Sequence, residues 1–214
     1  ASGLGVVSIA GAPSYENLFL MNGVVLNENL RGQAISAYIE DAIEETPVVT
    51  SGVSAEFGRF SGGMVNAITK SGGNDFSGTF RTTLENDDWR TRTPLNETKA
   101  DQLIPTYEYT FGGPVLKDRI WFFTAGRFVE ETRAFDAQYT DLSWERVRDE
   151  KRYEGKATYA IDASHTVRGS YLYKKAVTEN DASNANIFDA ASLTTREDPE
   201  KLMSLNYNGI FGSG

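Results

Sequence analysis

The residues best suited to catalysis surround the single histidine, His165, which follows Ser164 and lies three positions after Asp162. A serine, a histidine and an acid can act as nucleophile, base and orienting group when a fold holds them in line. Nothing in this short polar stretch predicts such a geometry, so we interpret His165 as a surface turn residue. The sequence has no cysteine, which excludes thiolate metal sites and cysteine nucleophiles. We therefore expect neither enzyme activity nor a cofactor.

Two acidic clusters, residues 85–88 and 179–181, offer the carboxylate and amide oxygens that calcium prefers. Neither cluster has the glycine-punctuated spacing of an EF-hand loop, so we interpret both as solvated acidic loops and expect no metal site. The net charge of −9 argues against a nucleic-acid partner, because phosphate binding needs a surplus of lysine and arginine.

The first 75 residues contain short apolar runs separated by turn signals such as Asn22-Gly23. Within them, Ile35, Ile39 and Ile43 follow one another at four-residue spacing, and Pro47 comes shortly after. This spacing predicts an amphipathic helix over residues 34–45. The N-terminal part is therefore expected to be a small α+β domain.

From Phe76 onward, apolar and polar residues alternate over stretches of up to ten residues, which predicts β-strands with one apolar and one polar face. The stretch 119–129 is less regular because residues 120–123 are apolar on both faces. About six antiparallel strands are predicted, over residues 76–84, 106–111, 119–129, 156–161, 166–174 and 203–211.

The connections between these strands alternate strictly in length. Residues 113–118 and 162–165 form short connections, whereas residues 85–105, 130–154 and 174–201 form long ones that hold most of the acidic residues. Outer-membrane barrels have this arrangement, with short periplasmic turns and long outer loops. The many strand aromatics would fit either membrane girdles or cross-strand pairs in a soluble sheet, and the loop alternation favours the barrel.

Five charged residues lie on the polar faces of the predicted strands and would face the barrel interior. We expect them to form salt bridges with the N-terminal domain rather than to contact a substrate; they are Arg81, Glu108, Arg127, Lys156 and Arg168.

Residues 54–78 resemble the end of the plug domain of TonB-dependent outer-membrane receptors, and the Lys-Ser-Gly-Gly-Asn-Asp-Phe stretch is similar to the Oar-like subfamily. Residues 7–24 resemble an earlier plug stretch, with Ala10 where arginine is usual and Asn22 where aspartate is usual. Residues 111–123 resemble the first barrel hairpin of Oar-like proteins. The plug-to-barrel motif comprises Gly58, Gly62, Gly63, Asn66, Thr69, Lys70, Gly72 and Gly73.

The glycines of this motif also have a physical interpretation. Gly62 and Gly63 would let a strand approach the barrel wall closely, and Gly72 with Gly73 would form a sharp exit into the barrel.

The resemblance implies a membrane β-barrel of 22 strands with an α+β plug in its lumen. Residues 1–75 would be the C-terminal part of the plug, and residues 76–214 the first barrel strands, so we expect the chain to be a fragment. The implied location is the outer membrane of a Gram-negative bacterium. The implied partners are outer-membrane lipid, an unknown substrate, and a TonB-type energy-coupling protein reached through a missing N-terminal segment.

The function implied is uptake of a scarce or large substrate by energy-coupled displacement of the plug. Candidate ligand-binding residues are Asn27, Glu28, Asn29 and Arg31, a polar segment between strand-like runs. Two alternatives remain open. One is an Oar-like structural, adhesion or secretion-linked role, with other outer-membrane or surface proteins as partners. The other is a soluble extracellular module that purifies without detergent.

Overall fold

The computed structural model describes residues 7–28, 32, 34–52, 57–58, 60–89, 101–137, 139–182 and 189–212. Within these residues the chain forms two β-sheets and four three-residue 3-10 helices, and no α-helix. No helix in this described part is long and apolar enough to cross a membrane.

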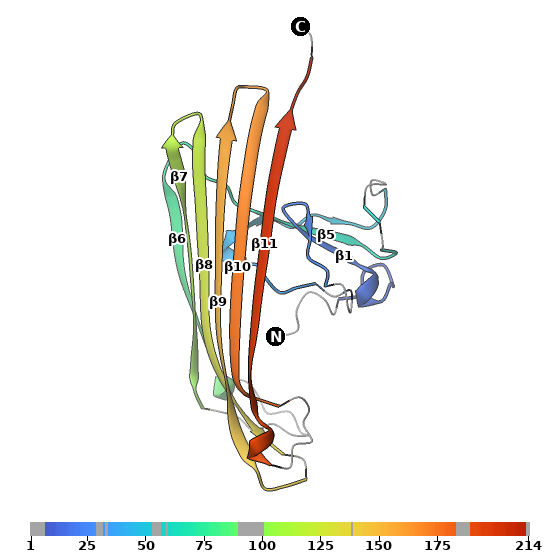
Figure 1. The fold of residues 1–214 in the computed structure, drawn as a ribbon, viewed down its shortest axis with the longest axis vertical. Helices are drawn as coiled ribbons and strands as arrows, with labels where there is room; N and C mark the ends of the chain where they lie inside the picture. The colour runs from blue at the N-terminus through green and yellow to red at the C-terminus, as the bar shows by residue number, and fades with distance from the viewer. Residues whose placement is uncertain are drawn as a thin grey trace.

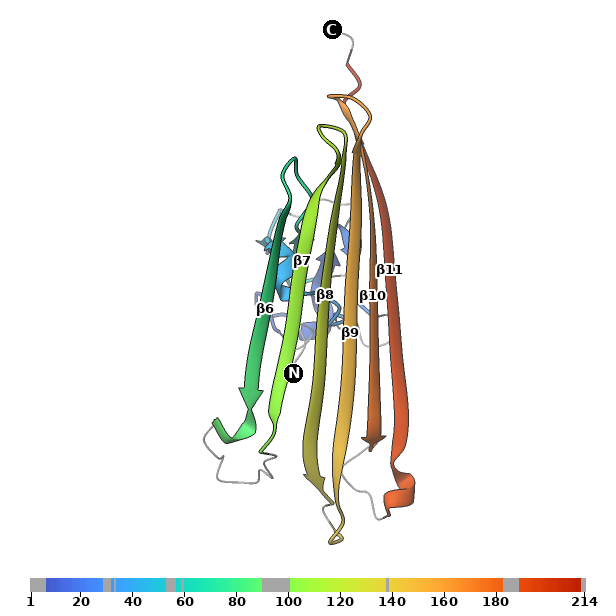
Figure 2. The same cartoon turned by 90° about the vertical axis from the view of Figure 1, so that its left-hand side faces the viewer.

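The larger sheet, which we call the wall, consists of six antiparallel strands in sequence order (Figures 1 and 2). This confirms the predicted six-stranded antiparallel sheet. The strands are β6 (Ser77–Asn86), β7 (Leu103–Leu116), β8 (Ile120–Asp136), β9 (Ser143–Ala160), β10 (His165–Asp181) and β11 (Thr194–Gly209).

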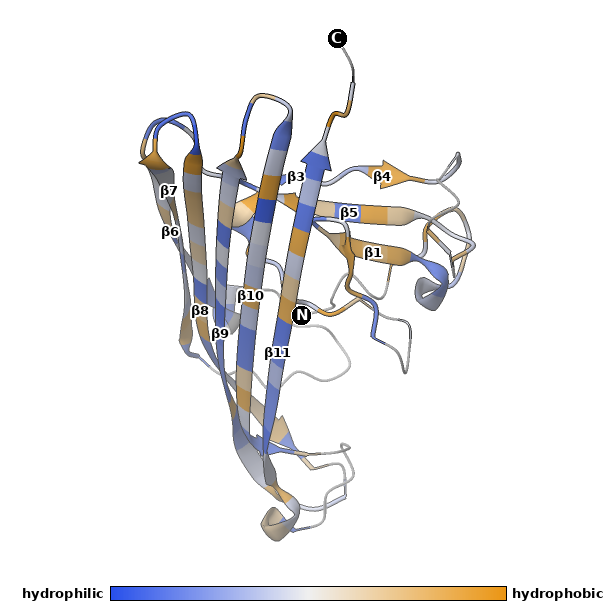
Figure 3. Ribbon diagram, turned by 45° about the horizontal axis from the view of Figure 1, so that its top comes forward, coloured by the Kyte–Doolittle hydropathy of each residue, from blue (hydrophilic) through white to orange (hydrophobic). Residues whose placement is uncertain are grey.

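The two faces of the wall differ in the way that a lipid-facing sheet requires. The outer face, away from the N-terminal residues, exposes large apolar side chains such as Phe111, Tyr171 and Leu205. On the inner face, charged residues such as Glu108 and Lys156 are buried. A sheet in water would place its apolar side chains inside, whereas a barrel wall in lipid places them outside. Figure 3 shows the alternation of polar and apolar residues along each strand.

The wall strands are longer than predicted at the end with the long connections. Residues 130–154, expected to be a loop, lie mostly in β8 and β9, and only residues 137–142 connect the two strands. Residues 85–86, 103–105, 174–181 and 194–201 are likewise strand. In this part Phe135 and Trp144 stack with ring centroids 5.7 Å apart, and Arg146 lies 4.5 Å from the Phe135 centroid. Where both faces of a sheet meet water, the ladder persists without apolar–polar alternation, so pattern alone missed these segments.

Residues 7–75, which we call the N-terminal unit, form a five-stranded sheet on the inner side of the wall (Figure 1). Its central strands β1 and β5 pair in parallel, and all four residues of β1 are buried. Asn22 and Gly23 join β1 to β2 with positive φ angles of 51° and 84°, as the tight two-residue hairpin turn requires. The strands are β1 (Leu18–Met21), β2 (Val24–Val25), β3 (Ile43–Glu45), β4 (Val48–Val49) and β5 (Met64–Thr69).

The helix predicted over residues 34–45 is wrong, so the described N-terminal unit is a sheet rather than an α+β domain. The segment contains only a 3-10 turn, η3 (Glu40–Ala42), followed by β3. Its backbone groups bind elsewhere: the Ile35 N–H donates to Leu26, and the Ala42 carbonyl accepts from Lys70. Ile39 is fully buried against Phe123 and Ala125 of the wall. These contacts, together with three β-branched isoleucines, favour an extended chain.

Candidate functional site

Charged and polar side chains gather where the N-terminal unit contacts the inner face of the wall. Three clusters of charged and polar side chains join the two parts. Two apolar patches accompany them, one around Phe19 and Leu172 and one around Ile39 and Phe123.

The first cluster surrounds Thr69, the last residue of β5. The Thr69 hydroxyl donates to the Glu154 carboxylate, and the Lys156 ammonium donates to the Thr69 carbonyl oxygen at 2.6 Å. Asn22 completes the cluster, because its amide oxygen accepts the Thr69 N–H at 3.0 Å and its amide nitrogen donates to the Thr69 hydroxyl oxygen at 3.0 Å. Thr69, Glu154 and Lys156 are each at least 95% buried. An aspartate at position 22 could not make the amide donation.

The second cluster connects three strands of the wall to η3. Glu108 on β7 is 1% exposed and accepts hydrogen bonds from Arg81 on β6 and from Arg127 on β8. Arg81 also contacts Glu40 at 2.9 Å and Asp41 at 3.2 Å. Both arginines therefore share their charge between a buried wall carboxylate and the acids of the N-terminal unit.

The third cluster is centred on Arg152 of β9, which is 7% exposed. Its guanidinium donates to the Tyr38 carbonyl oxygen, and its Nε donates to Glu150 at 2.6 Å. The guanidinium carbon also lies 5.7 Å from the Tyr38 ring centroid. Arg152 thus fixes the backbone of the same extended segment that carries Ile39.

The expected salt bridges with the N-terminal unit are confirmed for two of the five inward charges, Arg81 and Arg127. Arg81, Arg127 and Lys156 contact it directly, and Glu108 orients the two arginines. Arg168 differs, since its Nε is buried without a hydrogen-bond partner in the described part of the chain.

The expected role of Gly62 and Gly63 is wrong, because neither lies against the wall. A Cβ on Gly62 would lie 2.1 Å from the Asn17 side chain, and one on Gly63 would lie 2.5 Å from Ile9. Both glycines therefore serve packing inside the N-terminal unit. It is Gly72 that approaches the wall: a Cβ there would lie 2.2 Å from the Phe122 carbonyl oxygen.

We expect Gly72→Ala to displace the exit segment from the wall, at a cost of about 1–3 kcal/mol, because a backbone oxygen cannot move aside cheaply. Gly73→Ala is the matched control, since a Cβ at Gly73 meets nothing within 4 Å. Hydrogen exchange of residues 64–73 in the purified receptor should increase for the first variant only. Equal exchange in both variants would contradict this role of Gly72.

The remaining motif residues differ in their contacts. The Asn66 side chain accepts from the Gly23 N–H at 3.2 Å, and the Lys70 ammonium donates to the Asp41 carbonyl at 2.7 Å, so both stabilise the N-terminal unit. Gly58 is exposed, and a Cβ added to it would meet nothing within 4 Å.

Of the candidate ligand residues, Asn27 has its side chain fully engaged. Its amide accepts from Phe19 N–H at 2.8 Å and donates to the carbonyls of Asn17 and Gly32 at 2.8 and 2.7 Å. Glu28 is half-buried. Asn29 and Arg31 lie outside the described residues, so a ligand site in this segment stays a prediction.

His165 begins β10 rather than lying in a turn. Its Nδ1 is 2.6 Å from the Tyr207 hydroxyl, and the two rings stack. No group of three or more metal-ligating side chains occurs among the residues that the structure describes.

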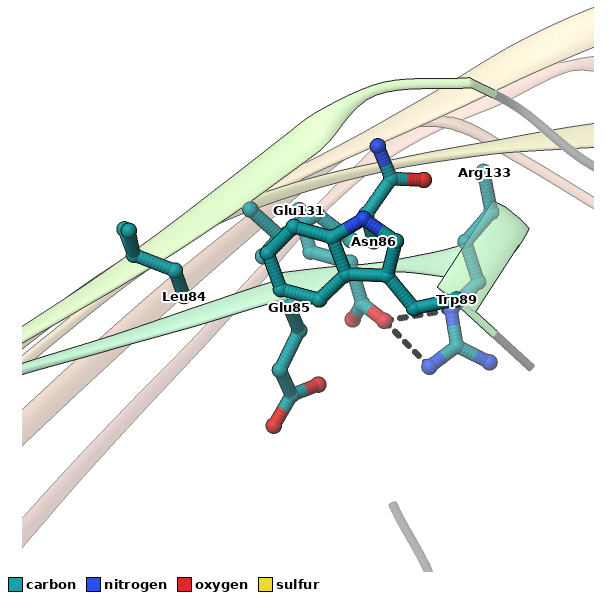
Figure 4. A pocket seen from close by; sticks show the side chains of 7 residues that line it. Leu84, Glu85, Asn86, Trp89, Glu131 and Arg133 are labelled. Atoms are coloured by element: carbon teal, nitrogen blue, oxygen red, sulfur yellow. Dashed lines mark hydrogen bonds and ion pairs between the residues drawn. The ribbon is translucent and has the colours of Figure 1, made fainter.

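A recess of about 330 Å³ lies at the end of the wall that carries the long connections (Figure 4). Arg133 and Glu131 form an ion pair inside it, and the exposed Trp89 indole lies over it. The recess is lined by Leu84, Glu85, Asn86, Trp89, Ile104, Glu131 and Arg133.

Sequence reasoning missed the acids that complete the interface. Glu40 and Asp41 fall within the predicted helix 34–45, and Glu154 falls within the predicted loop 130–154. The position of Glu154 could have been predicted, because it lies two residues before Lys156 and therefore on the same inward face of the strand.

Comparison with known proteins gives concordant results. Residues 68–141 match a family model described as an outer membrane beta barrel domain. The TonB-dependent transporter Oar of Myxococcus xanthus is 31% identical over an alignment covering 75% of this chain. A mutant of the ferric enterobactin receptor PfeA from Pseudomonas aeruginosa, solved with enterobactin, superposes with a TM-score of 0.69 over 96% of this chain at 16% identity. The siderophore receptor PirA from Acinetobacter baumannii gives 0.69 over 94% at 18% identity.

The chain spans only part of each of these proteins. It covers 18% of the length of the Myxococcus transporter, 32% of the PfeA chain and 31% of the PirA chain. At these identities the two crystal structures establish the fold alone.

Proposed function

Because this chain belongs to the TonB-dependent receptors of the bacterial outer membrane, of the Oar-like kind, we propose that its N-terminal unit is the plug of a transport barrel. The wall would be the first strands of that barrel, which is expected to have 22 strands. The complete receptor would take up a scarce or large substrate when energy coupling displaces part of the plug.

The observation that carries this proposal is the polar character of the contact between the unit and the wall. Thr69, Glu154 and Lys156 form one cluster, and Arg81 with Glu108 forms another. Polar contacts exchange with water at a small net cost, whereas an apolar contact of the same size would resist separation in a wet lumen. A plug held in this way can be displaced without unfolding the barrel.

The orientation follows from the lengths of the connections. We place the short turns after β7 and β9 in the periplasm and the long connections outside, as in bacterial outer-membrane barrels. Substrate would be captured from the outer side. A TonB-type protein would act on a segment N-terminal to this sequence.

The test uses a thiol at Val65, which is 7% exposed and packs in the same cluster as Leu172 of the wall. The chain itself has no cysteine. In a full receptor that is otherwise free of cysteine, the thiol introduced by Val65→Cys is therefore the only one that the reagent can label. A membrane-impermeant maleimide is applied to cells in growth medium. We expect labelling of the thiol introduced at position 65 to increase in energised cells and to fall with a proton uncoupler.

The control is Asp141→Cys, at an exposed residue between β8 and β9, whose labelling should not depend on energy. Energy-independent labelling at both positions would contradict plug displacement. Such a result would favour the alternative, a structural or adhesion role. The extension of β8 and β9 beyond the apolar part of the wall is compatible with that role.

A further inference from the structure

We propose that the recess under Trp89 binds an alkylammonium group, the chemistry of a lysine side chain and of a free aliphatic amine. Glu85 and the Trp89 indole are its two recognition groups. The proposal rests on the proposed function only in placing the long connections on the outer side, and it names the chemical class that is captured there.

The recess lies on the inner face of the wall, which would border the lumen of a complete barrel. Glu85, Ile104 and Glu131 line it from three neighbouring strands, β6, β7 and β8. Each of them lies four residues along its strand from a wall residue of the second cluster, on the side of the long connections. Residues at even spacing along a strand share a face, so these side chains point inward, about 13 Å beyond that cluster.

The charges of the lining leave one carboxylate available to a ligand. Arg133 and Glu131 form an ion pair, so these two charges neutralise each other. Glu85 is exposed and has no ion-pair partner among the residues that the structure describes. Figure 4 marks the contact of Arg133 with Glu131 and none of Glu85. The described lining therefore carries a net negative charge, located on Glu85.

The apolar part of the lining suits the carbon stem of a cation. Ile104 is buried and supplies an apolar surface, whereas the Trp89 indole is 66% exposed. The face of a tryptophan attracts an ammonium group more strongly than other aromatic side chains do. An alkylammonium group would therefore place its stem on Ile104 and Trp89 and its charge beside Glu85. An anion would meet two carboxylates and an arginine that is already paired.

The surroundings of the recess favour cations as well. The long connections hold most of the acidic residues of the chain. Asp88 is exposed next to Trp89, and Asp101 accepts a hydrogen bond at 3.0 Å from Asn86, which lines the recess. Acidic side chains around a concave site raise the local concentration of cations and speed their arrival. Binding of an alkylammonium group should therefore weaken as the salt concentration rises.

The experiment is a saturation-transfer NMR titration of the purified full-length receptor in detergent, with Nα-acetyl-lysine methylamide as the probe. Nα-acetyl-norleucine methylamide has the same carbon stem without the ammonium group and is the matched probe. We expect the double variant Glu85→Gln, Trp89→Leu to bind the lysine probe about 4- to 25-fold more weakly. An exposed ion pair and an exposed cation–π contact each contribute roughly 2- to 5-fold in affinity. The norleucine probe should bind weakly to both forms.

Glu179→Gln is the matched control, because it removes the same charge from an exposed residue at the same end of the wall, outside the recess. It should leave binding of the lysine probe unchanged. Unchanged binding by the double variant would overturn the proposal. So would an equal loss in the control, which would indicate a general effect of acidic charge, or equal binding of the two probes.

Butylammonium distinguishes the two sources of the ligand. Weaker binding than that of the lysine probe would assign the alkylammonium group to a polypeptide, and tighter binding would assign it to a free amine. The purified receptor is not energised in this experiment. Its result is therefore independent of plug displacement, which the labelling at position 65 tests separately.

Discussion

Replacing Glu108 with alanine is expected to weaken the attachment of the N-terminal unit to the wall by about 3 kcal/mol. Glu108 is 1% exposed, and both Arg81 and Arg127 donate to it. Among the described residues, removing the carboxylate leaves the two guanidinium groups with Glu40 and Asp41 as their remaining acidic contacts. Breaking a buried ion pair from one side costs about 3–5 kcal/mol. The side chains of Arg81 and Arg127 are 40% and 20% exposed, so water compensates in part and the lower end applies.

Hydrogen exchange of residues 39–43 measures this effect in the intact receptor. Their protection should fall roughly 100-fold, which corresponds to the expected free energy. Glu145→Ala is the control, because Glu145 is exposed on β9, away from the contact with the N-terminal unit. Equal loss of protection in both variants, or none in Glu108→Ala, would contradict the role of Glu108.

A double-mutant cycle tests whether Glu108 and Glu40 act through the same arginines. Both carboxylates contact Arg81 and Arg127. Residues that share partners in one network are coupled by about 0.5–3 kcal/mol. We therefore expect the effects of Glu108→Ala and Glu40→Ala on exchange to be non-additive by at least that lower value. Strict additivity would mean that the two acids hold the unit independently.

Lys156→Met is expected to release the end of β5 from the wall, at a cost of about 2–4 kcal/mol. The variant loses a charge-assisted hydrogen bond of 2.6 Å to the Thr69 carbonyl, which contributes about 1.5–3 kcal/mol. It also removes the Lys156 charge that acts on the Glu154 carboxylate, which is 3% exposed. Amide hydrogen exchange of residues 66–70 measures this release. Lys117→Met, in the exposed turn, is the control and should leave that exchange unchanged.

A second variant separates the two contributions. Combining Lys156→Met with Glu154→Gln should recover more than half of the lost protection, because the amide still accepts from the Thr69 hydroxyl and no uncompensated charge remains. If the double variant shows less protection from exchange than Lys156→Met alone, the buried Glu154 carboxylate is not the source of the lost free energy.

The sequence predicts the wall well where one face meets lipid. Alternation of Tyr107, Tyr109 and Phe111 with Thr106, Glu108 and Thr110 predicted both the strand and the direction of Glu108. The same rule missed the strand ends near Phe135 and Trp144, since water on both faces removes the alternation. Those segments depend on cross-strand stacking and salt bridges, which are properties of paired strands and not of one strand.

The N-terminal unit was harder to predict for a different reason. The four-residue spacing of Ile35, Ile39 and Ile43 is helical as a pattern, but Ile35 and Ile39 pack in two separate apolar clusters, one around Phe19 and one around Phe123. The Tyr38 carbonyl between them accepts a hydrogen bond from Arg152. A pattern within one segment carries no information about contacts from strands far away in the sequence.

The uninterrupted ladder of β9 has a mechanical consequence. One strand carries Trp144 near its outer tip and Glu154 and Lys156 beside Thr69, and its pairing with β8 continues throughout without a register shift. The distance along the strand from Trp144 to Lys156 is about 40 Å. A force applied at the Trp144 end of the strand would meet no interruption of the ladder before it reaches the Thr69 cluster. The paired strands β8 and β9 thus connect their Trp144 end to the contact with the N-terminal unit through one continuous ladder.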